Sequence, residues 1–257
     1  MSRNAKLKFN KIRLRGYSGN QLKMIACLLM LCDHIGCMLI ENGVLYGQNP
    51  AYWTLAISTP EGQRWLLLAR ILRTIGRMAF PVFAFLAVEG FCHTSNIKVY
   101  LRRVLICALI SEVPFNLACY HSMSYPAYQN TCFTIFFGLM ALCFIKMLQK
   151  RQFIFSVLAV LIFSGLAQLF KTDYGAEGVI LISILYILRN DNTLRLLSGA
   201  LISFIESFRM GGVSALSFIL IRFYNGKRGS GTLKYFFYLF YPLHMLIFYL
   251  CVVYVNR

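Results

Sequence analysis

The chain has 257 residues, of which 58% are apolar and only 14% are charged, and its formal net charge is +17. Soluble globular domains carry about 25% charged residues, so this composition excludes a disordered chain, a coiled coil and a small disulfide scaffold, and it argues against a water-soluble globule. The Lys and Arg residues recur at the ends of apolar segments rather than in one continuous patch, which favours a membrane surface over nucleic acid as their partner.

The apolar segments predict an all-α, polytopic integral membrane helical bundle with about nine transmembrane helices, within a range of about eight to ten. Residues 1–19 form a basic tail, and residues 20–257 form a single transmembrane domain. A helix needs about 20 residues to cross a bilayer; the shorter spans leave tilted or re-entrant arrangements open. The predicted spans cover residues 20–41, 72–93, 99–119, 131–148, 152–170, 176–189, 193–208, 211–224 and 235–255.

The connecting segments alternate between many and few Lys and Arg residues; the basic tail is rich in them and residues 120–130 have none. Because positively charged connections stay in the cytoplasm, the alternation predicts a cytoplasmic N-terminus, an outer C-terminus and insertion in the cytoplasmic membrane. The long connection 42–71 holds both tryptophans, Trp53 and Trp65. Tryptophan is enriched at membrane–water interfaces, so we expect this segment to lie on the outer membrane surface.

The nine cysteines lie mostly within apolar runs, where a free thiol packs as a small hydrophobic side chain. The sequence contains no Cys or His spacing typical of a metal site, and we predict neither a metal nor a bound cofactor. Cys119 and Cys132 are the exception, because both fall near the predicted outer face. A disulfide between these two residues therefore stays open.

Polar side chains inside the spans indicate a functional site, because an ionisable group costs at least about 2.5–3.5 kcal/mol to place in hydrocarbon. Asp33 and His34 are adjacent near the middle of the first span and point about 100° apart on a helix, so each needs its own partner or water. The other polar groups occur at every depth, which predicts a cleft or pathway through the bundle; they are Arg77, Glu89, His93, Glu112, Asn116, Asn130, Glu177 and His244.

His34 is the predicted general base, because imidazole titrates close to neutral pH. The group that orients its far nitrogen has to come from another helix, with Glu112 as the first candidate and Glu177 as the second. A purely structural role stays open for Arg77, as an ion-pair partner of Glu112 or Asp33. It also stays open for His244, as a hydrogen-bond donor to a carbonyl freed by a helical proline.

Five segments, taken in order, resemble the TraX family of conjugal-transfer membrane proteins: MIACLLMLCDHIGCMLI, IGRMAFPVFAFLAVEGFCHTSNIKVYLRRVLICALISEVPFN, NTCFTIFFGL, DYGAEGVILI and FYLFYPLHMLIF. The resemblance covers most of residues 20–190 and the last span. It implies a membrane acyltransferase, since the family's named member acetylates the N-terminal amine of a conjugative pilin. Related membrane acyltransferases take the acyl group from a cytoplasmic acyl-CoA and rely on a histidine in an early span, which corresponds here to His34.

The residues and the resemblance together predict transfer of an acetyl group from acetyl-CoA to an amine or hydroxyl acceptor, either a pilin N-terminus or a cell-surface glycan. The expected partners are membrane lipids, the acyl-CoA donor and that acceptor. A small proton-coupled transporter, a lipid-carrier flippase and a non-catalytic scaffold of a pilus or secretion machine remain the alternatives.

Each polar residue has an expected role in that reaction. The catalytic group is predicted to comprise His34, Asp33, Glu112 and Arg77. The donor, including its phosphates, is expected to contact Glu89, His93, Arg102 and Arg103, with Lys98 nearby. The acceptor is expected to contact Asn116, Asn130, Tyr174, Glu177 and His244.

Overall fold

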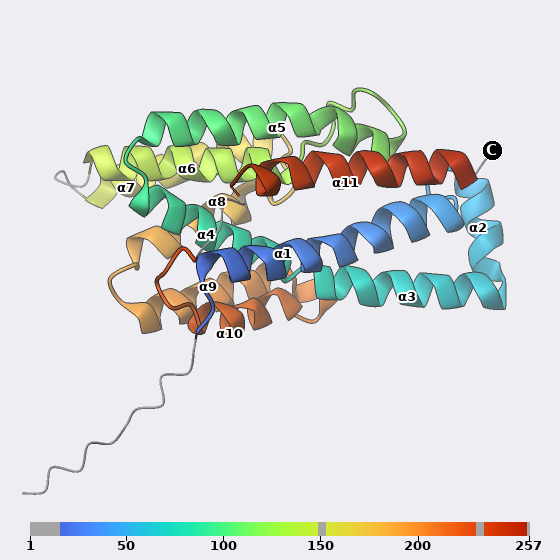
Figure 1. Cartoon of the computed structure of the whole chain (residues 1–257), viewed down its shortest axis with the longest axis horizontal. Coiled ribbons are helices and arrows are strands. Elements are labelled where there is room, and N and C mark those ends of the chain that lie inside the picture. The colour runs from blue at the N-terminus through green and yellow to red at the C-terminus, as the bar shows by residue number, and fades with distance from the viewer. Residues whose placement is uncertain (1–15, 149–152, 230–233, 256–257) are drawn as a thin grey trace, which may run out of the picture.

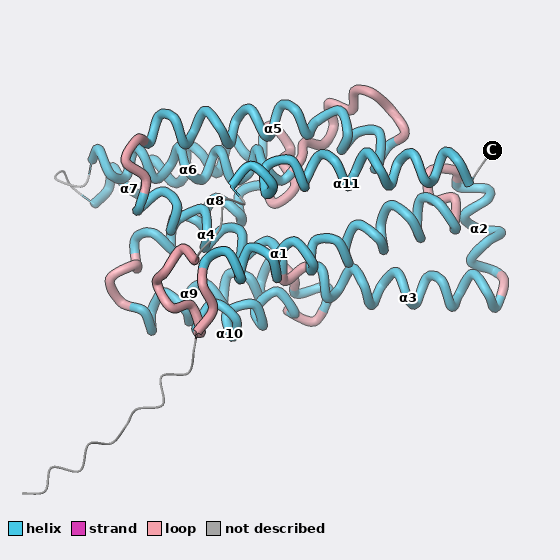
Figure 2. The backbone as a smooth tube through the Cα atoms, viewed as in Figure 1, coloured by secondary structure: helices cyan, strands magenta, loops and turns pink. Residues whose placement is uncertain are grey.

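The computed structural model describes residues 16–148, 153–229 and 234–255, which are helical throughout apart from short connections and two isolated bridges (Figures 1 and 2). The α-helices are α1 (Gly19–His34), α2 (Pro50–Ser58), α3 (Pro60–Gly76), α4 (Ala79–His93), α5 (Ile97–Tyr120), α6 (Thr131–Leu148), α7 (Phe153–Leu169), α8 (Gly175–Ile187), α9 (Asn192–Glu206), α10 (Ser217–Arg222) and α11 (Lys234–Val255). A π-helix, η1 (Ile35–Val44), continues α1, and two 3₁₀ turns, η2 (Phe208–Met210) and η3 (Val213–Leu216), precede α10.

The described residues form five helical segments that are long and apolar enough to cross a membrane: Gly19–Val44, Pro60–His93, Ile97–Tyr120, Thr131–Leu148 and Phe236–Tyr254. The chain is therefore an all-helical membrane protein. The other four predicted spans are also helical, as α7, α8, α9 and η3 with α10. Because these helices are too short or too polar to qualify, nine crossings are not confirmed.

The prediction for residues 42–71 is wrong for residues 60–71, which belong to the membrane-spanning segment Pro60–His93. Thr59 caps α3 by accepting a hydrogen bond from the Gly62 amide, and Pro60 occupies the first helical turn, where its missing N–H costs nothing. From there α3 packs along α1 and η1, and after a short turn α4 continues it. The second span thus begins at residue 60 rather than 72.

Helices α1 and α3 approach each other closely at Gly76. A Cβ atom at this position would lie 2.3 Å from the Asp33 Cβ and 2.7 Å from its backbone nitrogen, so no other residue fits without moving one helix. Asp33 and the neighbouring His34 are consequently fixed against α3. The π-helix begins at the next residue, Ile35, and such turns are common at functional sites.

Helix α9 buries polar residues and exposes several apolar ones. Its buried residues are Arg195, Gly199 and Ser203, and its exposed ones include Leu197 and Leu201. This is the reverse of a helix on a soluble protein, and it suits a surface covered by lipid.

The largest hydrophobic core lies around α4, which is buried along most of its length and contacts α1, α6, α8 and α10. A second cluster joins η1, α5 and α11 through Met38, Phe115 and Met245. Figure 1 shows that η1, α3 and the second half of α11 extend beyond α6–α8 to the end of the molecule where α2 lies. The two clusters therefore lie on either side of the residues around His34.

Candidate functional site

A cavity of about 700 Å³ runs through the bundle between α1, α4, α5, α6 and α11. One face of α1 lines it, through Lys23, Cys27, Met30, Asp33 and His34. Lys23 and His34 are eleven residues apart, which corresponds to about 16 Å along a helix. The cavity therefore joins the beginning of α1 to the interior of the protein.

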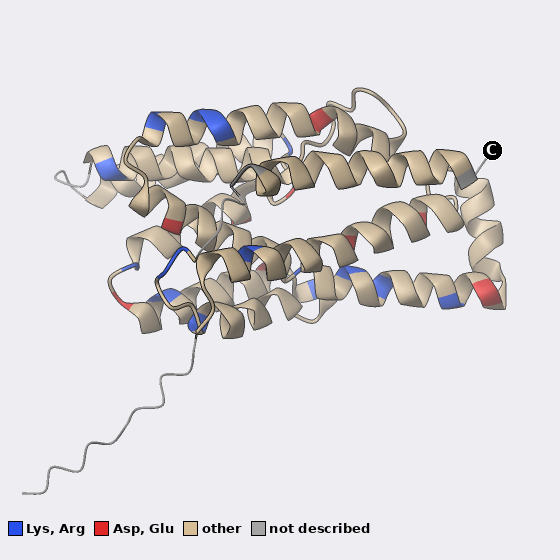
Figure 3. Ribbon diagram, viewed as in Figure 1, with Lys and Arg blue, Asp and Glu red and all other residues tan. Residues whose placement is uncertain are grey.

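The cavity opens at the end where α1 and α5 begin. There its wall includes the exposed residues His93, Asn96 and Arg228 and the half-buried Arg103. Arg228 is held beside α1, because its carbonyl accepts a hydrogen bond of 2.9 Å from the Asn20 amide. In the ribbon of Figure 3, blue Lys and Arg positions lie on α5 near its beginning and in the loop beside α1. The mouth is therefore positively charged.

His34 meets a second histidine at the inner part of the cavity. Its Nδ1 lies 2.6 Å from Nε2 of His244 on α11, and the two ring planes are nearly parallel, 11° apart, with centroids 4.8 Å apart. The predicted orienting partners are therefore wrong, because neither Glu112 nor Glu177 contacts His34. His244 itself is 6% exposed and does not line the cavity. Its Nδ1 contacts the Phe240 carbonyl oxygen, one helical turn earlier.

Asp33 pairs with an arginine that the sequence analysis did not single out. Nε of Arg73 lies 3.7 Å from its carboxylate, and Nη1 of Arg73 lies 2.7 Å from Glu41 on η1. Arg77, the predicted partner, makes no ion pair within the described part of the chain. Its guanidinium lies 5.9 Å from the centre of the Tyr174 ring instead, and it does not line the cavity.

The inner end of the cavity contains a second carboxylate, Asp173, which the sequence analysis missed. Its two oxygens accept hydrogen bonds from the hydroxyls of Tyr128 at 2.8 Å and Thr131 at 2.6 Å. Burial, together with the neighbouring Asp173 charge, raises the pKa of the Tyr128 phenol, so this donor stays protonated at neutral pH. Tyr174, a predicted acceptor contact, does line the cavity and stacks on Phe80 at 3.6 Å.

Glu89 lines the cavity near its mouth but is neutralised by Arg195 of α9. Nη2 of Arg195 lies 2.9 Å from Oε1 of Glu89, and the guanidinium covers the Phe85 ring at 4.5 Å. His93 lies one turn further along α4, with its Nδ1 4.0 Å from the other oxygen of Glu89. Glu89 thus forms a buried ion pair in the cavity wall, and Arg195 is a second residue that the sequence analysis did not identify.

The two arginines predicted to bind the donor phosphates have different surroundings. Arg103 lines the mouth, whereas Arg102 is exposed and, like Lys98, lies outside the cavity wall. Lys23 and Arg228 line the mouth in their place. Because neighbouring residues on α5 point about 100° apart, only one member of the Arg pair can face the cavity.

Three further predicted residues lie outside the cavity wall. Glu112 on α5 accepts hydrogen bonds from the side chain and the backbone amide of Asn130, whose amide also donates to the Ala108 carbonyl at 2.9 Å. Asn130 in turn accepts from the Cys132 amide in the first turn of α6. Asn116 is 2% exposed and does not line the cavity. The Glu112–Asn130 contact joins α5 to the start of α6, which is a structural role.

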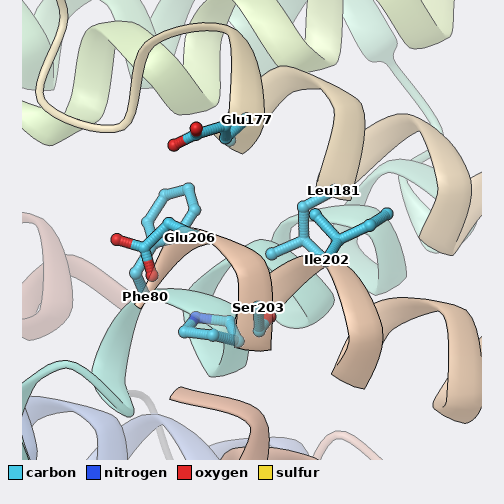
Figure 4. Close-up of a pocket in the computed structure, with 8 residues that line it drawn as sticks. Phe80, Glu177, Leu181, Ile202, Ser203 and Glu206 are labelled. Atoms are coloured by element: carbon cyan, nitrogen blue, oxygen red, sulfur yellow. The ribbon is translucent and has the colours of Figure 1, made fainter. Parts of the chain in front are cut away.

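Glu177, the remaining predicted residue, lies at a separate crevice between α4, α8 and α9 (Figure 4). It faces Glu206, whose Oε2 accepts a hydrogen bond of 3.2 Å from Ser214. Phe80 lines both this crevice and the large cavity. The crevice is too narrow to hold a water molecule, so Glu177 is not part of the site around His34.

The disulfide left open between Cys119 and Cys132 is not formed, because all nine cysteines are free thiols. Each of the two has another partner. Sγ of Cys132 lies 4.0 Å from Sγ of Cys107 in the wall of the cavity, while Cys119 contacts Cys37 on η1.

We expect an added thiol oxidant, copper phenanthroline, to join Cys107 to Cys132 and not Cys119 to Cys132. A disulfide requires the sulfurs to move to about 2.05 Å, a shift that neighbouring helices can provide. Peptide mass spectrometry after alkylation would identify the linked pair, with Cys107→Ser as the control that removes the link. Recovery of a peptide linked through Cys119 and Cys132 would contradict this arrangement.

The fold and the cavity define a helical membrane protein with a histidine pair at the inner part of a cavity whose mouth is basic. A family model described as TraX protein matches residues 18–252, and the chain belongs to this family. It is also 25% identical over 256 residues to a protein named "Probable fimbrial assembly protein FimC, serogroup H1" from Dichelobacter nodosus, an alignment that covers 90% of this chain and 94% of the relative. No solved structure matches.

Proposed function

We propose that this protein is a membrane acetyltransferase that moves an acetyl group from acetyl-CoA to an acceptor involved in pilus or fimbrial assembly. The observation that carries the proposal is the single cavity that connects a cationic mouth to His34. A donor with an anionic head and a reactive thioester at its far end matches that distribution of charge and length. The fimbrial assembly name of a relative and the TraX family support the choice of acceptor.

The phosphate groups of the donor bind at the mouth, beside Lys23, Arg103 and Arg228. Arginine presents several donors in a plane and is suited to phosphate oxygens. The thioester then extends along α1 toward His34. This orientation implies that the mouth faces the cytoplasm, where acetyl-CoA is made, and it agrees with the cytoplasmic N-terminus expected from the charge distribution in the sequence.

His34 acts as the general base. It removes a proton from the acceptor amine or hydroxyl, which then attacks the thioester carbonyl carbon. The carbon–sulfur bond breaks, and the departing thiolate takes the proton back from His34. Asp33 and Asp173 line the same part of the cavity and orient the acceptor before the transfer. Transfer through an acetylated His34 remains chemically equivalent in its products.

Charge reversal at the mouth provides the test. We expect Arg103→Glu to raise the KM for acetyl-CoA about 10- to 100-fold, because a hydrogen bond to a charged group contributes about 1.5–3 kcal/mol, with kcat little changed. Steady-state release of CoA by protein in detergent, with an amine peptide or a glycan as acceptor, gives both constants. Arg102→Glu is the matched control, since this neighbouring side chain is exposed and lies outside the cavity wall.

An unchanged KM in the Arg103→Glu protein would contradict binding of the donor phosphates at the mouth of the cavity. Absence of both acetyl-CoA binding and CoA release in the native protein would reject the acetyltransferase itself. In that case uptake of a solute into vesicles would favour the transporter, which also accounts for ionisable groups along a cavity.

A further inference from the structure

The two histidines of the site form a chain of hydrogen bonds that ends on a backbone carbonyl. His34 contacts the cavity, whereas His244 is buried behind it and contacts the Phe240 carbonyl. We infer that His244 is a positioning residue that holds the proton of His34 on Nδ1 and leaves Nε2 of His34 as the base. This inference rests on the proposed acetyl transfer, although its main test does not.

The direction of these hydrogen bonds follows from the Phe240 carbonyl, which has no proton to donate. A carbonyl oxygen only accepts, so Nδ1 of His244 has to carry a hydrogen and donate it to Phe240. In a neutral imidazole the other nitrogen then holds a lone pair. Nε2 of His244 is therefore an acceptor, and the atom 2.6 Å from it, Nδ1 of His34, is the donor. This arrangement leaves the lone pair of His34 on Nε2.

The surroundings of His244 keep its ring in this orientation. Phe240 stacks on it with centroids 4.8 Å apart, and Phe248 meets it edge-on at 5.7 Å, so aromatic residues one turn away on either side confine the ring. The residue is 6% exposed. A buried, confined imidazole that is bonded to its own helix has little freedom to rotate or to exchange its two nitrogens.

Asp33 does not position the proton of the His34 ring. Its side chain points about 100° away from that of His34 on α1, and its carboxylate pairs with Arg73. The charged groups that act on His34 include Arg73 and Arg77, and Asp33 and Asp173 line the same cavity. No hydrogen bond joins any of them to the His34 ring within the described residues. His244 is thus the group whose geometry determines which nitrogen of His34 carries the proton.

This arrangement has a consequence for each step of the transfer. The proton of the acceptor moves to Nε2 of His34 while the acceptor attacks the thioester carbonyl, and the ring becomes an imidazolium. Nδ1–H of His34 keeps its bond to His244, which now stabilises a charged donor and is therefore stronger. When the carbon–sulfur bond breaks, the proton leaves Nε2 for the CoA sulfur, and both rings return to their starting state.

Nitrogen NMR of histidine-labelled protein is the direct test. The chain has only four histidines, so single substitutions assign every signal. We expect ¹⁵N shifts that place the proton of both His34 and His244 on Nδ1 at a pH where both rings are neutral. A proton on Nε2 of His34 would overturn the inference. The result is independent of any acetyl transfer, so failure here and failure of the proposed function are distinguishable.

Two substitutions at His244 separate positioning from packing. His244→Gln places an amide oxygen that can accept from His34, whereas His244→Phe fills the space but offers no acceptor. We expect the Phe variant to lower kcat about 10²-fold or more, within the range for general base catalysis, and the Gln variant to retain most of the activity. KM for acetyl-CoA should stay constant in both, because His244 lies outside the cavity wall.

Equal loss in both variants would show that packing alone accounts for the effect and would overturn the inference. Full activity in the Phe variant would do the same. Thermal stabilisation of each variant by acetyl-CoA serves as the check that the cavity is intact.

Discussion

His34→Ala protein is expected to lose acetyl transfer almost completely, with kcat reduced by about 10²–10⁴-fold, because a general base contributes roughly that factor. The fold should be retained, since the ring is only half-buried and lines a cavity rather than filling a core. CoA release measured with a saturating donor, alongside the thermal unfolding midpoint, separates lost chemistry from lost structure.

His121→Ala is the matched control for this experiment. His121 is an exposed residue that ends α5, far along the chain from the cavity-lining segments of α1. Wild-type turnover by purified His34→Ala protein would eliminate the proposed mechanism, whichever acceptor is used. Loss of turnover in both variants would instead point to general damage by histidine removal.

Arg195→Met is expected to cause the largest loss of stability, about 3–5 kcal/mol, because it leaves the Glu89 carboxylate without its partner. The side chains of Arg195 and Glu89 are only 8% and 17% exposed, so bulk water shields the remaining carboxylate only in part. Unfolding in a titration with a denaturing detergent would measure the change. Arg64→Met on the exposed surface of α3 is the control and should change the free energy of unfolding little.

The double variant Arg195→Met with Glu89→Gln tests the cause. Removing both charges eliminates the unpaired carboxylate, so we expect part of the lost stability to return, as in other double-mutant cycles between contacting residues. Additive losses in the double variant would show that Arg195 stabilises the protein through its contact with Phe85 and not through Glu89.

Local sequence patterns predicted most of the helices but not how all of them meet the membrane. Each predicted span corresponds to one or more helices, because apolar runs bounded by Pro, Gly and Asn give a clear local signal. Most of α3 was not predicted as part of a span, because Arg64, Arg70 and Arg73 lower its hydropathy. Its contacts with η1 at Ala69 and with α1 at Gly76 depend on partners that hydropathy does not reveal.

Site residues that lie next to each other in one segment could be predicted from the sequence. Contacts between residues of distant segments could not. The Asp33–His34 pair was evident, because two adjacent ionisable residues in a span demand an explanation. The contact between His34 and His244 joins residues 210 positions apart, and no spacing rule connects them. Arg195 is one of many Lys and Arg residues near the ends of apolar segments, and only its contact with Glu89 distinguishes it.

The distance between the cationic mouth and His34 also limits what can serve as a donor. A molecule held at Lys23 has to reach about 16 Å along α1 before its reactive carbon meets the imidazole. Small acetyl donors such as acetyl phosphate carry the charge and the acetyl group on adjacent atoms, so they cannot occupy both ends at once. Under the proposed function, the length of the cavity therefore favours donors with a long, flexible arm between the anionic group and the reactive carbon.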